Sequence, residues 1–503
     1  MSRAIARRSA SKRRGSGRLL ALSAGFALLA CVGCEQGVAL AGRGDLDAPT
    51  RPEDTAPEGV GDEAGGVDAD TASDSEVDAG PDADAEAEAD TDAEAGEDAD
   101  ADEDAPDVVP LPTCASMTAD LVVPRDADGI QAAIDMAEPG AVICVEAGEY
   151  REQLHLGEKP VWIVGVAGPA ATIVDGGGEG VVVWIGAPAG PDTVLEGFTI
   201  CNGWNDSGFA GGIEINNASP VLRHLVVRDN GAIVGAAGGL HISGTSSPTI
   251  ADSIIAGNEA AGWGGGLTIE GGRVTLQNVL VIGNGDDGAY GGGLLVDGDA
   301  SSSLTATNVI VAGNSQGIWL RGENEVTLTN VIVARNRGEG LLAHGNGPMT
   351  FRNVSVTHNH GFGLRNDIGS TMSVSRCNSW GNVEVAWDGP DDVVGYTGDW
   401  AAGGNLSVDP GYLDVSGDNP LLWNFHLSPD SPLVDAGDVA VPDPDGGRSD
   451  IGAWGGPEAD DWDLDADGHP SWWMPGPYDP LRDPALGLDC DDFRIAVGPG
   501  SGC

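Results

Sequence analysis

Four residues that could do chemistry return at one position of a repeated phrase in the middle of the chain. The phrase reads GGIEIN, GGLHIS, GGLTIE, GGLLVD, GIWLRG and GLLAHG in successive copies. Three residues after its first Ile or Leu stand Glu270, Asp297, Arg321 and His344, with Trp319 in the neighbouring column. Hydrolysis of a glycosidic bond uses paired carboxylates, and proton abstraction uses a positioned basic residue. If the copies stack in register, these side chains form a column with neighbours about 5 Å apart.

The same column can also be interpreted without catalysis, as a binding face or as ordinary solvent-exposed surface. Its full membership is Asn216, Ser243, Glu270, Asp297, Arg321, His344 and Asp367. Most of these residues lie at a strand-to-turn corner, which is solvated, and opposite charges stacked there contribute little to stability. Glu270, Asp297 and Arg321 form the only run of adjacent carboxylates with a facing Arg. We therefore treat the four as weak catalytic candidates and favour a binding face or a plain surface.

The elements that must position this column are short strands in a repeat. Asparagine returns at intervals of 22 to 30 residues, at Asn202, Asn230, Asn258, Asn284, Asn314, Asn336, Asn359 and Asn382. Each unit has two short runs rich in Val, Ile and Thr, separated by Gly and Asn, and shows no helical periodicity. One unit cannot bury its own apolar face, so the units must stack. The sequence predicts an all-β, right-handed parallel β-helix, in which the asparagines form a structural ladder because their amides bond the backbone and the next Asn.

The start of the repeat region predicts a helical cap and resembles a known superfamily. Ile130, Ala133, Ile134 and Ala137 lie on one helical face, and Pro139-Gly140 ends the helix. This order, followed by VEAGEY, TIVDGGG and LEGFTICNG, resembles the opening of bacterial β-helix proteins of the pectate-lyase-like superfamily. The resemblance spans roughly residues 120–457. It implies the β-helix fold and admits several activities, among them Ca²⁺-dependent polysaccharide lyases and glycoside hydrolases.

The N-terminus has the features of a secretory signal. Residues 1–18 contain seven Lys or Arg and no acid, and an apolar run follows from Leu19 to Ala30. The segment from Leu28 to Cys31 resembles a bacterial lipobox, which implies a signal peptide over 1–30 and lipidation of Cys31. Cys34 is the second candidate, and an ordinary signal peptide is the alternative.

Composition predicts a tether between this anchor and the repeats. The chain carries a formal net charge of −55 and has eight cysteines. The charge argues against a nucleic-acid partner, and the cysteines suggest an oxidising compartment. Residues 31–112 are rich in Ala, Asp and Glu, and residues 45–107 alone contain 26 Asp and Glu with one basic residue. Such a segment cannot offset the entropy of ordering, so we expect a disordered acidic linker.

The cysteines and histidines of the repeat region show no clear catalytic or metal arrangement. Cys114 and Cys144 could pair across the N-terminal cap, whereas Cys201 and Cys377 fit buried small apolar positions. His224, His358 and His360 fall in different phases of the repeat, so no metal triad is predicted.

The end of the chain divides into a closing segment and an acidic tail. The text GGNLSVDPGYLD, FHLSPDSPLVDAGD and DPDGGRSDIGAWGGP resembles the closing segment of secreted bacterial β-helix proteins and is expected to wrap the last coils. The β-helix domain is thus assigned to 113–457 and the tail to 458–503. The tail has carboxylates at alternate positions, an oxygen-rich pattern that suits Ca²⁺, and an Asp-Cys-Asp-Asp run that resembles a short metal-binding module. The predicted ligands are Asp461, Asp463, Asp465, Asp467, Asp489, Asp491 and Asp492, and Cys490 and Cys503 would form a disulfide.

Together these features predict a monomeric lipoprotein of the bacterial cell envelope, in the outer membrane or on the extracellular surface. It would contact the membrane only through its lipid anchor. Its expected role is structural, adhesive or carbohydrate-binding without catalysis, with an extracellular polysaccharide or a cell-surface component as partner. The alternative is a calcium-dependent polysaccharide lyase or glycoside hydrolase.

Overall fold

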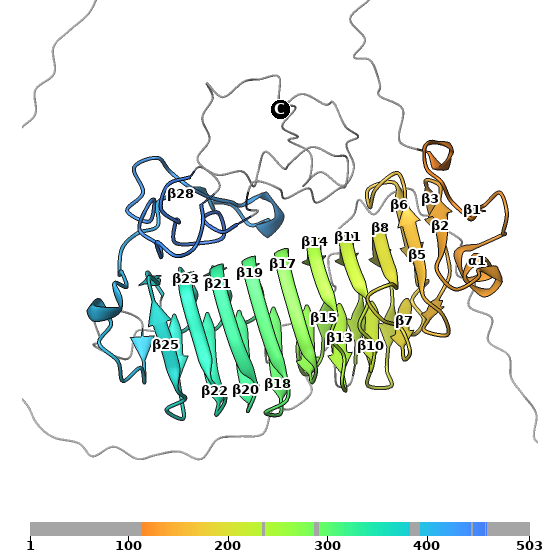
Figure 1. Cartoon of the computed structure of the whole chain (residues 1–503). Coiled ribbons are helices and arrows are strands. Elements are labelled where there is room, and N and C mark those ends of the chain that lie inside the picture. Colours follow the sequence, from red (N-terminus) through yellow and green to blue (C-terminus); the bar gives the residue numbers. More distant parts are fainter. Residues whose placement is uncertain are drawn as a thin grey trace, which may run out of the picture. The chain divides into compact units, whose positions relative to one another are not determined.

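The computed structural model describes residues 113–233, 237–285, 291–382, 393–443, 446–457 and 459. The predicted signal peptide, acidic linker and nearly all of the C-terminal tail lie outside these ranges. Figure 1 shows the described strands following one another in chain order along one axis. Among the described residues, no helix combines the length and the apolar character that crossing a membrane requires.

Two parallel sheets form the walls of the coils. Sheet A has 14 strands and sheet B has ten, and neighbours in each belong to successive coils. Along the strands of sheet B, side chains alternate: Ile213 and Ile215 point into the core, while Glu214 and Asn216 lie on the opposite face. Because a connection between parallel strands of one sheet is right-handed, the chain folds as an all-β, right-handed parallel β-helix, as predicted.

The strand bounds follow the repeated text. Sheet A contains β1 Leu121–Val123, β2 Ala141–Val145, β3 Gly148–Tyr150, β5 Val161–Gly165, β6 Thr172–Asp175, β8 Val194–Cys201, β11 Val221–Arg228, β14 Thr249–Ala256, β17 Arg273–Ile282, β19 Ser303–Ala312, β21 Glu325–Ala334, β23 Met349–Thr357, β25 Met372–Ser375 and β26 Asn378–Trp380. Sheet B contains β4 Leu154–Leu156, β7 Val183–Gly186, β10 Ile213–Asn216, β13 Leu240–Ser243, β16 Leu267–Glu270, β18 Leu294–Gly298, β20 Ile318–Gly322, β22 Leu341–Gly345, β24 Leu364–Asn366 and β27 Val393–Val394.

Smaller elements complete the described chain. A three-stranded parallel sheet contains β9 Trp204–Asn205, β12 Gly231–Ala232 and β15 Glu259–Ala260. An antiparallel pair joins β28 Tyr412–Asp414 to β29 Asn424–Leu427. Three single turns of 3-10 helix are η1 Cys114–Ser116, η2 Ala401–Gly403 and η3 Pro420–Leu422.

The predicted helical cap is present at the entry to the β-helix. Helix α1, Ile130–Met136, buries Ile130, Ala133 and Ile134 and lies at the same end as β1 and β2 (Figure 1). The Glu152 carboxylate accepts hydrogen bonds from the backbone N–H groups of Ile130 and Gln131, at 2.8 and 2.9 Å. These bonds satisfy two of the otherwise unpaired donors at the helix N-terminus. The helix thus covers the open end of the core, as stacking repeats require.

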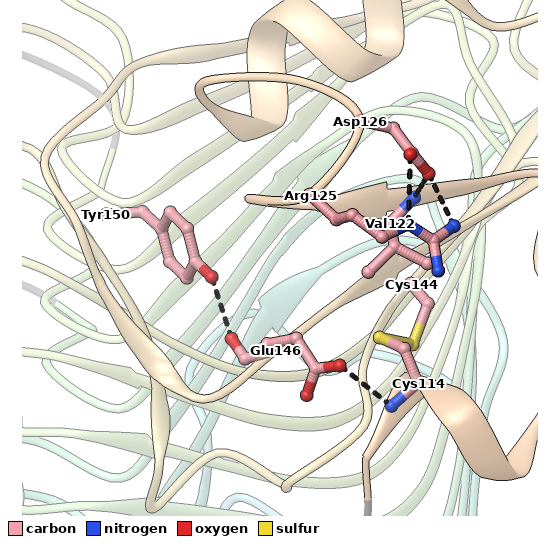
Figure 2. Close-up of a disulfide and its surroundings, with 7 residues drawn as sticks. All are labelled: Cys114, Val122, Arg125, Asp126, Cys144, Glu146 and Tyr150. Atoms are coloured by element: carbon pink, nitrogen blue, oxygen red, sulfur yellow. Dashed lines mark hydrogen bonds and ion pairs between the residues drawn. A yellow bond between two sulfur atoms is a disulfide. The ribbon is translucent and has the colours of Figure 1, made fainter.

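A disulfide fixes the chain as it enters this cap. Cys114 and Cys144 are bonded, which ties η1 to the buried strand β2. Figure 2 shows Glu146 beside them, where its carboxylate accepts a hydrogen bond from the Cys114 backbone N–H at 3.1 Å. The Glu146 carbonyl accepts another from the Tyr150 hydroxyl at 2.8 Å. The pairing that the sequence left open is therefore formed.

Seven buried asparagines form a continuous hydrogen-bonded row. From Asn230 to Asn359, each side-chain amide donates to the amide oxygen of the next Asn, at 2.8 to 3.1 Å. Each amide also donates to a backbone carbonyl, as Asn314 does to Val281 at 3.0 Å. The left-handed backbone conformation belongs to the residue that precedes each asparagine of the row. Asp229, which precedes Asn230, has φ 54°. The members of the row are Asn230, Asn258, Asn284, Asn314, Asn336, Asn359 and Asn382.

Asn202, expected as the first member, is one position out of phase. Because Cys201 pairs with Arg228, Asn202 aligns with Asp229 and shares its left-handed backbone, with φ 57°. Gly203 stands at the row position instead, and its backbone N–H donates to the Asn230 side chain at 2.9 Å. A Cβ at Gly203 would lie 2.0 Å from the Gly211 carbonyl oxygen. No Asn side chain fits there, so the row begins at Asn230.

A second row of left-handed corners divides the long strands of sheet A. It includes His224, Asp252, Asn278, Asn308, Asn330 and Asn353, with φ between 45° and 55°. The Asn278 amide donates to Asp252 at 2.8 Å, and the Asn308 amide donates to Asn278 at 3.0 Å. The sequence carried this signal as the recurring QNV, TNV and RNV, but only the first row was singled out.

The closing segment packs on the outside of sheet A. Trp423, Phe425 and Trp454 contact outward apolar side chains that include Leu280 and Ile310. Figure 1 shows the blue closing segment, with β28, beside these strands. The cluster extends from β11 to β21. Asn353 on β23 also binds the segment, because its amide donates to Ser449 and its oxygen accepts from the Asp438 backbone N–H. The segment therefore covers more coils than the last ones alone.

Candidate functional site

The outward side chains of sheet B, from β10 to β24, form the candidate site, which we call the ladder face. Residues two apart on a strand share a face, so the two columns seen in the sequence stand side by side on it. The register is the one expected from the repeated phrase: Asp297 pairs with Arg321, and Arg321 pairs with His344. Glu270 pairs with Ser243 on the other side. The four predicted residues therefore lie on four consecutive coils.

Their side chains do not act as one column, because only Asp297 and Arg321 pair with each other, whereas Glu270 and His344 pair with residues outside the set. Arg321 Nη1 lies 3.3 Å from Asp297 Oδ2. His344 Nδ1 lies 3.4 Å from an oxygen of Asp367 on the next coil. Glu270 turns the other way and lies 3.2 Å from His241 Nε2. The ladder thus divides into three ion-paired groups.

The first group is a carboxylate–imidazole–carboxylate stack across β10, β13 and β16. His241 Nδ1 lies 3.0 and 2.9 Å from the two carboxylate oxygens of Glu214, whose side chain is fully buried. The Ala210 backbone N–H donates to Glu214 at 3.1 Å. Burial opposes protonation of His241, but hydrogen bonds to Glu214 and Glu270 outweigh it and raise its pKa to about 9. The same contact lowers the pKa of the Glu270 carboxyl. At neutral pH the imidazole is therefore a cation.

The second group is an aromatic pair joined to an arginine. The rings of Trp263 and Trp319 stack with centroids 5.7 Å apart and planes 21° apart. The Arg321 guanidinium carbon lies 4.7 Å from the Trp263 centroid and 5.0 Å from that of Trp319. Both indoles are half-buried. Trp263 precedes β16 and Trp319 lies on β20, so the pair links coils that are two apart.

The third group lies near the end of the ladder face. Arg365 lies 2.7 Å from Glu339, contacts Asp367, and has its guanidinium 4.9 Å from the Phe362 ring centroid. His344 joins the group through Asp367. Every cation of these three groups therefore has a carboxylate partner.

The remaining histidines and thiols lie elsewhere. His224 and His358 are corner residues with positive φ, and burial lowers the pKa of His358. Within the described ranges, no three His, Cys, Asp or Glu side chains are arranged to hold a metal ion. Cys201 and Cys377 are buried, and burial raises the pKa of Cys377 to about 12, so this thiol is unreactive at neutral pH.

Two functional features were missed from the sequence. Glu214 and His241 lie in the repeated phrases GGIEIN and GGLHIS but were not singled out, although alternation puts them on the same face as Glu270. Trp263 lies outside the repeated phrase, in a loop, and no periodicity pointed to it. The predicted lipidation site Cys31, the seven tail carboxylates from Asp461 to Asp492, and the pair Cys490–Cys503 lie outside the described residues.

Comparisons with known proteins were made by family model, by curated sequence and by solved structure. The search of curated proteins returned no match. The chain is similar to a solved structure titled "Crystal structure of pectate lyase Pel9A", at 14% identity and a TM-score of 0.48, over 69% of this chain and 99% of that one. It is also similar to a pectin methyl esterase of the rice weevil, at 13% identity and a TM-score of 0.23, over 44% and 80%. Residues 292–389 match the family model described as a right handed beta helix region.

Proposed function

We propose that this chain is a secreted, lipid-anchored protein of the bacterial cell surface whose ladder face binds polysaccharide without catalysis. The observation that carries the proposal is the stacked pair Trp263–Trp319 with Arg321 beside both rings. Indole rings offer large apolar area in a rigid frame. The Asp297 carboxylate, which contacts Arg321, adds a hydrogen-bond acceptor to this group. Binding sites of this kind combine aromatic walls with a few fixed polar groups.

The repeat supports an extended ligand rather than a small one. Equivalent outward positions recur on every coil of sheet B at the strand spacing of about 4.8 Å. The three ion-paired groups follow one another from β10 to β24 along this direction. A polymer lying parallel to the stacking axis would contact several groups at once, as extended ligands do on other solenoids.

The states of His241 and Arg321 favour binding over turnover. A lyase or hydrolase needs a group free to accept or donate a proton near working pH. His241 has a pKa of about 9 and contacts two carboxylates, so it is a poor base at neutral pH. Arg321 is paired with Asp297. The enzyme alternative is tested by replacing Glu270, Asp297 and Arg321 together with Ala and assaying turnover of acidic polysaccharides. Unchanged activity in an active parent would exclude these residues as catalytic.

The binding proposal is tested on a glycan array with the full chain. We expect saturable binding to at least one polysaccharide, and Trp263→Ala to weaken it about fivefold, because one aromatic contact is worth roughly 1 kcal/mol. Affinity for the soluble oligosaccharide is measured by calorimetry. Trp204→Ala is the matched control, since Trp204 is 46% exposed on β9, outside sheet B. Equal loss in both variants, or no glycan bound at all, would contradict the proposal.

We propose lipidation of Cys31 as the means of anchoring in the cell envelope. The support is the lipobox-like segment that follows a basic, then apolar, N-terminus. Cys31→Ser is expected to move the protein from the membrane fraction of cells to the soluble fraction, as judged by immunoblot. Cys34→Ser is the control and should leave the protein in membranes. The reverse pattern would assign the anchor to Cys34.

We also propose that the acidic tail binds Ca²⁺. The support is its run of alternate carboxylates, completed by a glycine, because Ca²⁺ takes six to eight oxygen ligands. Calorimetric titration of the full chain should give a saturable event with a Kd on the order of 10⁻⁴ to 10⁻³ M, typical of extracellular modules. The event should disappear when Asp463, Asp465 and Asp467 are all replaced by Asn. A variant that retains it would exclude these ligands.

A further inference from the structure

We infer that the polysaccharide bound by the ladder face is an uncharged, hydroxyl-rich chain and not a polyanion such as a polyuronate. The inference rests on the proposed function and names the class of its ligand. It is carried by the pairing of charges on the ladder face.

The cations of the ladder face are already matched by carboxylates. His241 lies between Glu214 and Glu270, at 2.9 and 3.2 Å. Arg321 lies 3.3 Å from Asp297. Arg365 contacts both Glu339 and Asp367. In these groups five carboxylates face three cations, so the local charge that a ligand meets is negative.

Freeing one of these cations for an anionic ligand would disrupt the site. Glu214 is fully buried, and drawing His241 away would leave its carboxylate buried and unpaired, which is strongly unfavourable. Arg321 contacts Asp297 and also lies against the two indoles. The Arg321 guanidinium is therefore already engaged by the aromatic pair, and a ligand carboxylate would have to displace Asp297 to bind it.

The local charge also acts before contact. The excess of carboxylates over cations on the ladder face repels anionic ligands over about a Debye length, near 8 Å at physiological salt. A polyanion would approach against this repulsion before any contact forms. An uncharged chain would not feel it.

Hydrogen-bond chemistry favours hydroxyl groups. Ionised carboxylates only accept hydrogen bonds, and Glu270 and Asp297 both have partly exposed side chains, at 51% and 36%. A ligand must therefore donate to them. Sugar hydroxyls donate in both neutral and uronate chains, but each uronate residue also brings a carboxylate that can only accept and would face these acceptors unpaired. Apolar C–H faces of an uncharged sugar ring also suit the indoles better than a charged edge does.

The test uses the full chain and a panel of neutral, polyuronate and cationic amino-sugar polymers at 20 and 300 mM NaCl. We expect the neutral class to bind at least tenfold more tightly than any polyanion at low salt, with little salt dependence. Tighter binding of a polyuronate would overturn the inference but leave the proposed function intact. If the cationic polymer bound most tightly and lost this binding at high salt, binding would be explained by charge attraction alone. That result would also overturn the inference. If no polymer of any class bound, both the proposed binding function and the inferred ligand class would be wrong.

A charge variant sharpens the result. Asp297→Asn removes a negative charge and leaves Arg321 without its carboxylate, so the preference for neutral over anionic chains should fall about tenfold. Asp418→Asn makes the same charge change at an exposed position of the closing segment and should leave the preference unchanged. An unaltered preference in Asp297→Asn would show that pairing on the ladder face does not select the ligand.

Discussion

Replacing Asn314 by Ala is expected to lower the free energy of unfolding by about 3–5 kcal/mol. Asn314 is fully buried in the middle of the asparagine row. Its amide donates to Val281 and to Asn336, and its oxygen accepts from the backbone and side chain of Asn284, at 2.8 to 3.1 Å. Alanine leaves these buried partners unsatisfied, which costs more than the loss of a surface hydrogen bond. Urea denaturation followed by circular dichroism measures the change.

The matched control for the row is Asn346→Ala. Asn346 is exposed, in a turn after β22, so its replacement should change stability by less than about 0.5 kcal/mol. Similar midpoints for the two variants would mean that the row contributes no more than an ordinary turn. The same logic predicts a smaller loss at Asn382, because the row ends there.

Raising the pH from 6.5 to above 9 is expected to remove about 3 kcal/mol of stability. The folded protein raises the pKa of His241 from its ordinary 6.5 to about 9 because Glu214 and Glu270 favour the cation despite its burial. A raised pKa stabilises the folded state fully below pH 6.5, and the contribution is lost as the pH rises through 9. The side chain is only 6% exposed, so little solvent screening applies. Urea midpoints at pH 6.5, 8 and 9.5 measure it.

Two histidine variants separate this effect from general alkaline instability. His241→Gln cannot titrate and should flatten the dependence between pH 6.5 and 9, although it starts from lower stability because Glu214 stays buried. His344→Gln changes a histidine that is 46% exposed and should retain the wild-type slope. A wild-type midpoint that is constant from pH 6.5 to 9.5 would contradict the assigned charge state.

The relation between sequence and structure is clearest in the asparagine row. Spacing alone identified seven members, since a residue required at each coil must recur once per coil. It failed at Asn202 because a one-residue offset between coils is set by backbone pairing, and the space at that position admits only Gly203. The second corner row was missed because its residues vary, from His224 and Asp252 to Asn278. A position that needs only a left-handed backbone tolerates several residue types.

The ladder face shows the same division. The repeated phrase predicted which residues share a column, because register follows from the repeat. It did not predict which side chains contact one another across the coils. Glu270 pairs with His241 and not with Arg321, and Trp263, which lies in a loop, stacks on Trp319. Side-chain direction and loop path depend on packing between coils, which periodicity does not encode.

By itself, then, the sequence determined that this chain is a capped parallel β-helix with a closing segment, because one unit of alternating apolar residues is stable only when stacked on another. The tertiary structure alone decided which charges neutralise one another and where the aromatic pair stands. Those contacts join residues on different coils, at distances set by three-dimensional packing rather than by spacing along the chain.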